Sequence, residues 1–180
     1  MKKLIILFTA LLAISSLFVS CNKDDWSGGD PAYDHVYFVG FQDWGNFKNN
    51  VVYNVNQGDT VGIPIQFYSE NPMKVDVITD YYIAGDLQPE TDYKITDAEG
   101  NELMPDADGI YTLTWPKATK GVQRVYIKAL TSGSTGSFWI ETFDPEAAEG
   151  ISYTNLINNK TENYEVDAFT ENYKVKINIQ

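Results

Sequence analysis

The sequence predicts an all-β protein in which two sheets pack as a sandwich. Between residues 34 and 180 the apolar side chains recur with a period of two, which is typical of half-buried strands. Turn residues separate these runs, and no long amphipathic helix pattern interrupts them. With 180 residues, of which 43% are hydrophobic, the chain is long enough for one domain with a buried core.

Nine segments have the strand pattern and follow one another at about the spacing of a β-sandwich. The clearest alternation covers residues 61–67, and Pro64 interrupts it. Because a proline cannot donate to a sheet ladder, we expect this strand to lie at a sheet edge or to be bulged there. Residues 144–172 favour strands least, so we expect an ordered loop with a helical turn at 145–149. The expected strands cover residues 36–41, 51–55, 61–67, 75–83, 93–95, 110–115, 122–130, 137–143 and 173–179.

The first twenty residues have the layout of a secretory signal. Two lysines precede an apolar run over residues 4–18, which is shorter than a membrane-spanning helix requires. A small residue then precedes Cys21, the single cysteine of the sequence. Residues 17–21, Leu-Phe-Val-Ser-Cys, resemble the lipobox of bacterial lipoproteins, with Phe18 in place of the usual aliphatic residue. The resemblance implies a signal peptide over residues 1–20 and a lipid anchor on Cys21; a plain thiol beside an ordinary cleavage site is the alternative.

A short charged segment follows the cysteine. Lys23, Asp24 and Asp25 resemble the surface-export signal of lipoproteins from Bacteroidetes, which implies an outer-membrane protein that faces the cell exterior. A generic solvated tether is the alternative. The glycines and the proline that come next are typical of a flexible linker. We therefore expect a lipidated tether over residues 21–33 and one folded domain over residues 34–180.

Several turn and strand patterns occur together within residues 51–143. Gln57-Gly58-Asp59 precedes an alternating strand, and Asn71-Pro72-Met73 precedes another. Thr91-Asp92-Tyr93 follows, and the run from Tyr111 to Pro116 stands ahead of a further strand. In this order they resemble a Calx-beta domain, which implies an immunoglobulin-like two-sheet β-sandwich. The acidic calcium ligands of regulatory Calx-beta domains do not map cleanly onto this sequence, so the resemblance implies no calcium site.

Charge and composition exclude several classes of function. The chain has 25 Asp and Glu against 13 Lys and Arg, a net charge of −12, and no basic cluster that would bind nucleic acid. One histidine, His35, and one cysteine leave little for nucleophilic or zinc chemistry. Residues 106–109 resemble part of a calcium loop but lack the acids at its first and twelfth positions, so a hairpin turn is the better interpretation. We expect no enzyme, no cofactor and no metal.

Aromatic residues in or beside expected loops form the candidate ligand site. Trp44 and Phe47 lie in a polar stretch between the first two strands, and Tyr81 and Tyr82 precede a glycine turn. An exposed ring stacks well on the apolar face of a sugar, while nearby amides bond its hydroxyl groups. The alternative is that these rings cap the open end of the sandwich.

Three further expectations concern single residues. Trp115 and Trp139 lie within expected strands, so both are predicted to be in the core. Asp59-Thr60-Val61 resembles the O-glycosylation motif of Bacteroidetes, which implies a sugar on Thr60.

These observations together predict a cell-surface lipoprotein that acts as a non-enzymatic binding or adhesion module. Its partners are expected to be the membrane, through the lipid, and a glycan or another surface protein. One alternative is a structural accessory subunit of an outer-membrane transporter or adhesin complex that uses an exposed strand. A second is a carboxylate-dependent glycoside hydrolase, because 25 acids allow many carboxylate pairs.

Overall fold

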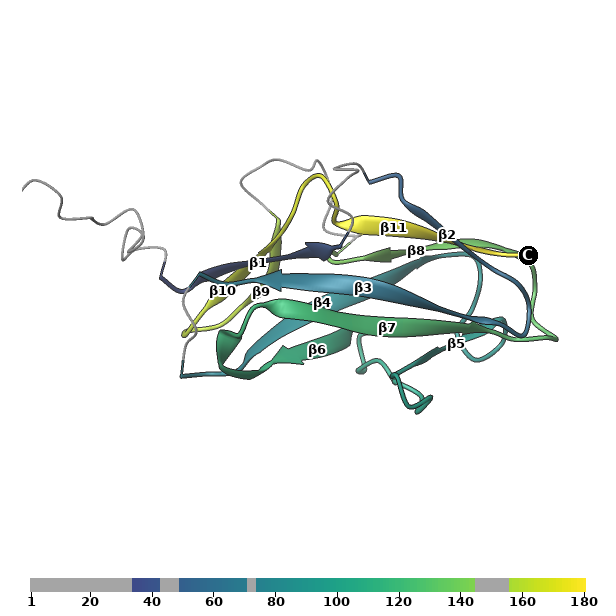
Figure 1. Cartoon of the computed structure of the whole chain (residues 1–180), viewed down its shortest axis with the longest axis horizontal. Helices are drawn as coiled ribbons and strands as arrows, with labels where there is room; N and C mark the ends of the chain where they lie inside the picture. Colours follow the sequence, from purple (N-terminus) through teal and green to yellow (C-terminus); the bar gives the residue numbers. More distant parts are fainter. Residues whose placement is uncertain (1–33, 43–48, 71–73, 145–155) are drawn as a thin grey trace, which may run out of the picture. The chain divides into compact units, whose positions relative to one another are not determined.

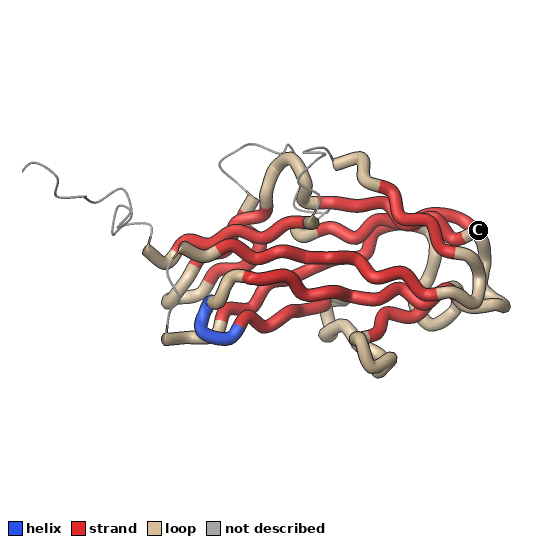
Figure 2. Tube along the Cα trace, viewed as in Figure 1, coloured by secondary structure: helices blue, strands red, loops and turns tan. Residues whose placement is uncertain are grey.

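The computed structural model describes residues 34–42, 49–70, 74–144 and 156–180. Their strands form two sheets, of order β5-β7-β3-β1-β10-β9 and β2-β11-β8-β4-β6, which enclose the main core (Figures 1 and 2). The predicted all-β, immunoglobulin-like sandwich is confirmed. The strands are β1 (Val36–Phe41), β2 (Val52–Val55), β3 (Thr60–Tyr68), β4 (Val77–Gly85), β5 (Tyr93–Thr96), β6 (Tyr111–Trp115), β7 (Gly121–Ala129), β8 (Gly136–Glu141), β9 (Ile157–Lys160), β10 (Glu165–Ala168) and β11 (Lys174–Ile179).

Helix is nearly absent from the described ranges. It is limited to the 3₁₀ turn η2 (Pro116–Ala118), which joins β6 to β7. Within the described residues no helix has the length and apolarity to cross a membrane. The turn at residues 106–109 is also present: the Asp106 carboxylate accepts hydrogen bonds from the backbone N–H groups of Asp108 and Ile110, both at 2.9 Å. It is not a hairpin turn, because β5 and β6, which flank it, belong to different sheets.

All nine expected strands are present, but the expected loop over residues 144–172 is wrong. That stretch contains β9 and β10, which pair antiparallel with each other, and β10 also pairs parallel with β1. Both strands have four residues, and their ladder partners lie on β1, far away in the sequence. The alternation of apolar and polar residues is therefore a weak signal in this stretch, and pairing with a distant strand determines that these residues form strands. The expected helical turn at residues 145–149 lies outside the described residues.

Pro64 lies within an inner strand, so its predicted place at a sheet edge or bulge is wrong. β3 has β7 on one side and β1 on the other, and its register with β7 runs through Pro64 opposite Arg124 without a shift. The Pro64 carbonyl accepts the backbone N–H of Gln42 at 3.0 Å. Because the nitrogen and carbonyl of one strand residue point to the same side, the proline nitrogen also faces β1. β1 ends at Phe41, opposite Ile65, so the proline meets only the last bond of this pairing, in which its carbonyl is the acceptor.

The core lies between the sheets and is rich in aromatic rings. Trp115 is 2% exposed, as predicted, and stacks on Phe67 with ring centroids 5.0 Å apart. Its indole N–H donates to the buried Thr79 hydroxyl at 2.9 Å. The expectation for Trp139 is wrong: Phe138 and Ile140 point inward, so the intervening Trp139 lies half-buried on the outward face of β8.

One end of β4 is completed by side chains instead of a strand. β4 pairs with β8 from Tyr82 onward, so the preceding residues have no strand on that side. The buried Asn158 of β9 fills this place: its Nδ2 donates to the carbonyls of Asp80 and Thr142, both at 2.7 Å, and its Oδ1 accepts the Asp80 N–H at 3.0 Å. The Tyr164 hydroxyl accepts the N–H of Ile78 at 3.1 Å. These bonds tie the edge of one sheet to the other.

Candidate functional site

The outward face of β1, β10 and β9 carries aromatic and acidic side chains side by side. The strand register places Ile157 of β9 beside Asp167 of β10, Asp167 beside Phe38 of β1, and Phe38 beside Tyr68 of β3. Phe38 is 40% exposed and Ile157 is 44% exposed, although both are large and apolar. Alternation directs these residues outward because their chain neighbours face the core.

Phe169 extends this face beyond the end of β10. Its N–H donates to the carbonyl of Val39 at 2.9 Å, so the pairing of β10 with β1 continues by one residue. Its ring covers Gly40, where a Cβ atom would come within 3.0 Å of the Phe169 ring and 2.8 Å of Asn172. The ring stacks on Phe38 at 5.4 Å and meets Tyr68 edge-on at 5.1 Å. The missing side chain at Gly40 is therefore what lets the three rings gather.

Two carboxylates of β10 lie next to these rings. Glu165 and Asp167 are two residues apart on one strand, so both face outward. Glu165 forms an ion pair with Lys160 across the β9–β10 ladder. Burial is the main cause that raises the pKa of Asp167, and the negative charge of Glu165 raises it further, whereas Lys160 lowers it. Asp167 is thus a carboxylate that a further cation would stabilise.

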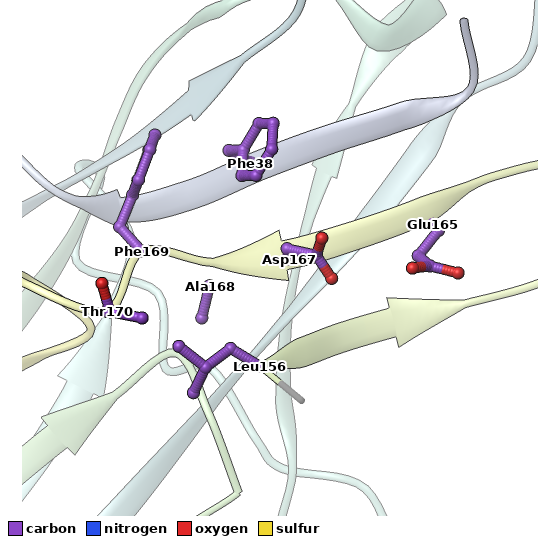
Figure 3. A pocket seen from close by; sticks show the side chains of 7 residues that line it. All are labelled: Phe38, Leu156, Glu165, Asp167, Ala168, Phe169 and Thr170. Carbon is purple, nitrogen blue, oxygen red and sulfur yellow. The ribbon is translucent and has the colours of Figure 1, made fainter. Parts of the chain in front are cut away.

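These residues line a pocket of about 280 Å³. Figure 3 shows the Phe38 and Phe169 rings at one side of it and Asp167 and Glu165 along β10. The remaining lining residues are Leu156, Ala168 and Thr170. An apolar wall beside a carboxylate suits a group with a flat or aliphatic part and a positive charge. Two carboxylates in one pocket are also what a glycoside hydrolase needs, but Lys160 already pairs with Glu165, which favours binding over acid–base chemistry.

The comparisons with known proteins find a distant likeness in fold. No protein-family model matches the chain, and no curated protein matches it. CaCohA2 from Clostridium acetobutylicum is similar at 13% identity, with 80% of this chain and 92% of that chain covered and a TM-score of 0.41. The third ScaB cohesin of R. flavefaciens, solved in complex with a group 1 dockerin, is 13% identical over 80% and 94%, with a TM-score of 0.35. The N-terminal domain of PorA is 12% identical over 78% and 95%, with a TM-score of 0.36. Sequence identities and TM-scores this low carry no information about which ligand this chain binds.

The residues predicted for ligand binding do not form one site in the described structure. Trp44 and Phe47 lie outside the described residues. Tyr81 is 1% exposed and stacks on Tyr111 in the core, so its ring is not available to a ligand. Tyr82 is half-buried on the outward face of the other sheet, where burial first and then the charges of nearby carboxylates raise its pKa to about 12.

Other sequence predictions remain predictions. Cys21, Lys23, Asp24 and Asp25 lie outside the described residues. Thr60 is exposed at the start of β3, opposite Lys128, and its glycosylation is untested. Among the residues that the structure describes, no group of three or more His, Cys, Asp or Glu side chains is placed to hold a metal ion.

Sequence reasoning missed the pocket residues for a physical reason. Phe38 lies in a run that is apolar on both faces, so its pattern predicts burial as readily as exposure. Phe169 lies in the stretch that was expected to be a loop. The one available signal was the Glu165–Asp167 alternation, which places two acids on one face of a strand.

Proposed function

We propose that the chain is a non-enzymatic binding module whose pocket on β1, β9 and β10 receives an arginine side chain of a partner protein. The observation that carries this proposal is the stacking of the exposed Phe38 ring on the half-buried Phe169 ring, beside a carboxylate whose pKa is raised by burial. A guanidinium group is planar, stacks on aromatic faces and can bond a carboxylate with two N–H groups. Phe38 and Phe169 would hold its plane and stem, and Asp167 would pair with its charge.

The pKa of Asp167 predicts how such binding depends on pH. Burial disfavours the ionised form, so the carboxyl takes up a proton at a higher pH than an ordinary aspartate. A guanidinium partner favours the ionised form and binds it in preference to the neutral acid. Binding is therefore expected to be strongest above this raised pKa and to weaken as the pH falls through it.

The test is a titration of the purified full chain with fluorescent nonapeptides that differ in one central residue. We expect the arginine peptide to bind about tenfold more tightly than the glutamine peptide. Asp167→Asn should remove that difference and its pH dependence, whereas Asp108→Asn, at an exposed turn, should change neither. Phe38→Ser should weaken binding, and Val122→Ser, equally exposed on the same sheet, should not. Equal binding of the two peptides, or an unaffected Asp167→Asn variant, would contradict the proposal.

The place of the module in the cell is a second part of the proposal. The lipobox-like residues 17–21 and the charged segment that follows support an outer-membrane lipoprotein that is anchored through Cys21. Cys21→Ser expressed in a native-type host should move the protein from the membrane fraction to the soluble fraction. Its melting temperature should stay the same, because the change lies outside the domain that we expect over residues 34–180. A variant that remains fully in the membrane fraction would show that the anchor is elsewhere.

A further inference from the structure

Two lysines converge on one tryptophan on the outward face of the five-stranded sheet. The ammonium group of Lys174 lies 4.9 Å from the centroid of the Trp139 ring, and that of Lys176 lies 5.9 Å away. Both lysines are on β11, whose side chains alternate, and Lys176 lies directly opposite Trp139 in the ladder with β8. This face belongs to a different sheet from the arginine pocket.

The charge of this face differs from that of the protein as a whole. The chain carries a net charge of −12, yet none of the ion pairs among the described residues includes Lys174 or Lys176. Glu141 lies opposite Lys174 but is buried, and this burial raises its pKa more than Lys174 lowers it. Glu141 compensates Lys174 in part, but the ladder neighbours of Lys176 are Trp139 and Val52, neither of which carries a charge. The two ammonium groups beside this ring therefore favour an anion.

Amide groups continue the same face. The next outward row along the strands places Asn54 of β2 beside Asn178 of β11 and Asn178 beside Ser137 of β8. Asn178 Nδ2 donates to Asn54 Oδ1 at 3.0 Å, and Gln180 Nε2 donates to the same oxygen at 3.4 Å. Amide and hydroxyl groups of this kind exchange hydrogen bonds with sugar hydroxyls.

We propose that this face binds a glycan that contains uronic acid. On binding, the ammonium groups of Lys174 and Lys176 move from over the Trp139 ring to the carboxylate of the sugar. The Trp139 ring that they uncover packs on the apolar face of the sugar ring, and Asn54 and Asn178 bond its hydroxyl groups. A dense polyanion such as nucleic acid is disfavoured, since the rest of the acidic protein repels it. The site is independent of the arginine pocket and does not rest on that function.

The experiment measures binding of two uronate tetrasaccharides to the full chain by tryptophan fluorescence and calorimetry. The probes are α-1,4-linked tetragalacturonate and a glucuronate-containing hyaluronan tetrasaccharide, each with its carboxyl-methylated counterpart. We expect at least one acid to bind about tenfold more tightly than its ester, and this preference to decrease with added salt. The Lys174→Gln, Lys176→Gln double variant should lose the preference, and Trp139→Leu should weaken acid and ester alike.

Matched controls separate this site from the rest of the molecule. Lys128→Gln removes an exposed lysine from the other sheet and should leave binding unchanged. Asp167→Asn should also leave it unchanged, so failure here and failure of the arginine pocket can be told apart. Thermal melting checks that each variant is folded. The proposal is overturned if neither acid binds at millimolar concentration, if acid and ester bind equally, or if the lysine variant keeps its preference.

Discussion

Replacing Asn158 by leucine is expected to lower the free energy of unfolding by about 3–5 kcal/mol. The side-chain amide makes three hydrogen bonds, to the N–H and carbonyl of Asp80 and to the carbonyl of Thr142. Leucine has a similar volume but bonds none of these groups, so they lose their partners at the junction of β9 with β4. Urea unfolding monitored by circular dichroism measures the change as a shift in the midpoint at constant slope.

Two further variants make this result specific to the amide. Asn163→Leu, at an exposed position of the same segment, should change stability by less than about 0.5 kcal/mol. Asn158→Asp keeps one acceptor for the Asp80 N–H but turns its second oxygen toward two carbonyls. This variant should be strongly destabilised at neutral pH, and the deficit relative to the parent should shrink in acid, where a protonated carboxyl can donate. A neutral effect of Asn158→Leu would show that the β4 edge is satisfied in another way.

Trp115→Ala is expected to destabilise the protein by about 3–5 kcal/mol, because it empties a large volume between the sheets. The change removes the ring that stacks on Phe67 and the donor to the Thr79 hydroxyl, which is 1% exposed. Trp115→Phe keeps an aromatic ring but loses that donor, and we expect it to cost about 1–2 kcal/mol. Equilibrium unfolding in urea gives both values.

Trp139 supplies the contrast for this prediction. Because it lies half-buried on the outward face of β8, Trp139→Leu should cost less than about 1 kcal/mol. A large cost for Trp139→Leu together with a small one for Trp115→Ala would contradict the assignment of the two rings to opposite faces of the five-stranded sheet.

These two tryptophans also show how far the sequence predicts the fold. Alternation identifies a strand, and it correctly predicts burial of Trp115 because that ring shares its face with other inward residues. The same alternation in β8, taken with its neighbours Phe138 and Ile140, directs Trp139 outward. Our expectation that any tryptophan within a strand is buried ignored this parity, which is a stronger signal than residue type.

The candidate pocket was beyond sequence reasoning for another reason. Phe38 and Asp167 meet through the parallel pairing of β1 with β10, and no local pattern specifies which strand lies beside which.

Pro64 is a similar case: the rule that excludes proline from inner strands holds only where the neighbouring strand needs its N–H. At Pro64 the strand β1 has already ended.

The two parallel strand pairs have a consequence for the order in which the chain folds. β1 pairs with β3 on one side but with β10 on the other, and the neighbour of β2 in its sheet is β11. A ribosome releases β1 and β2 long before the residues that complete their ladders. Contacts this distant in sequence slow folding and leave apolar strands exposed meanwhile. Both sheets can therefore be completed only after nearly the whole domain has been synthesised.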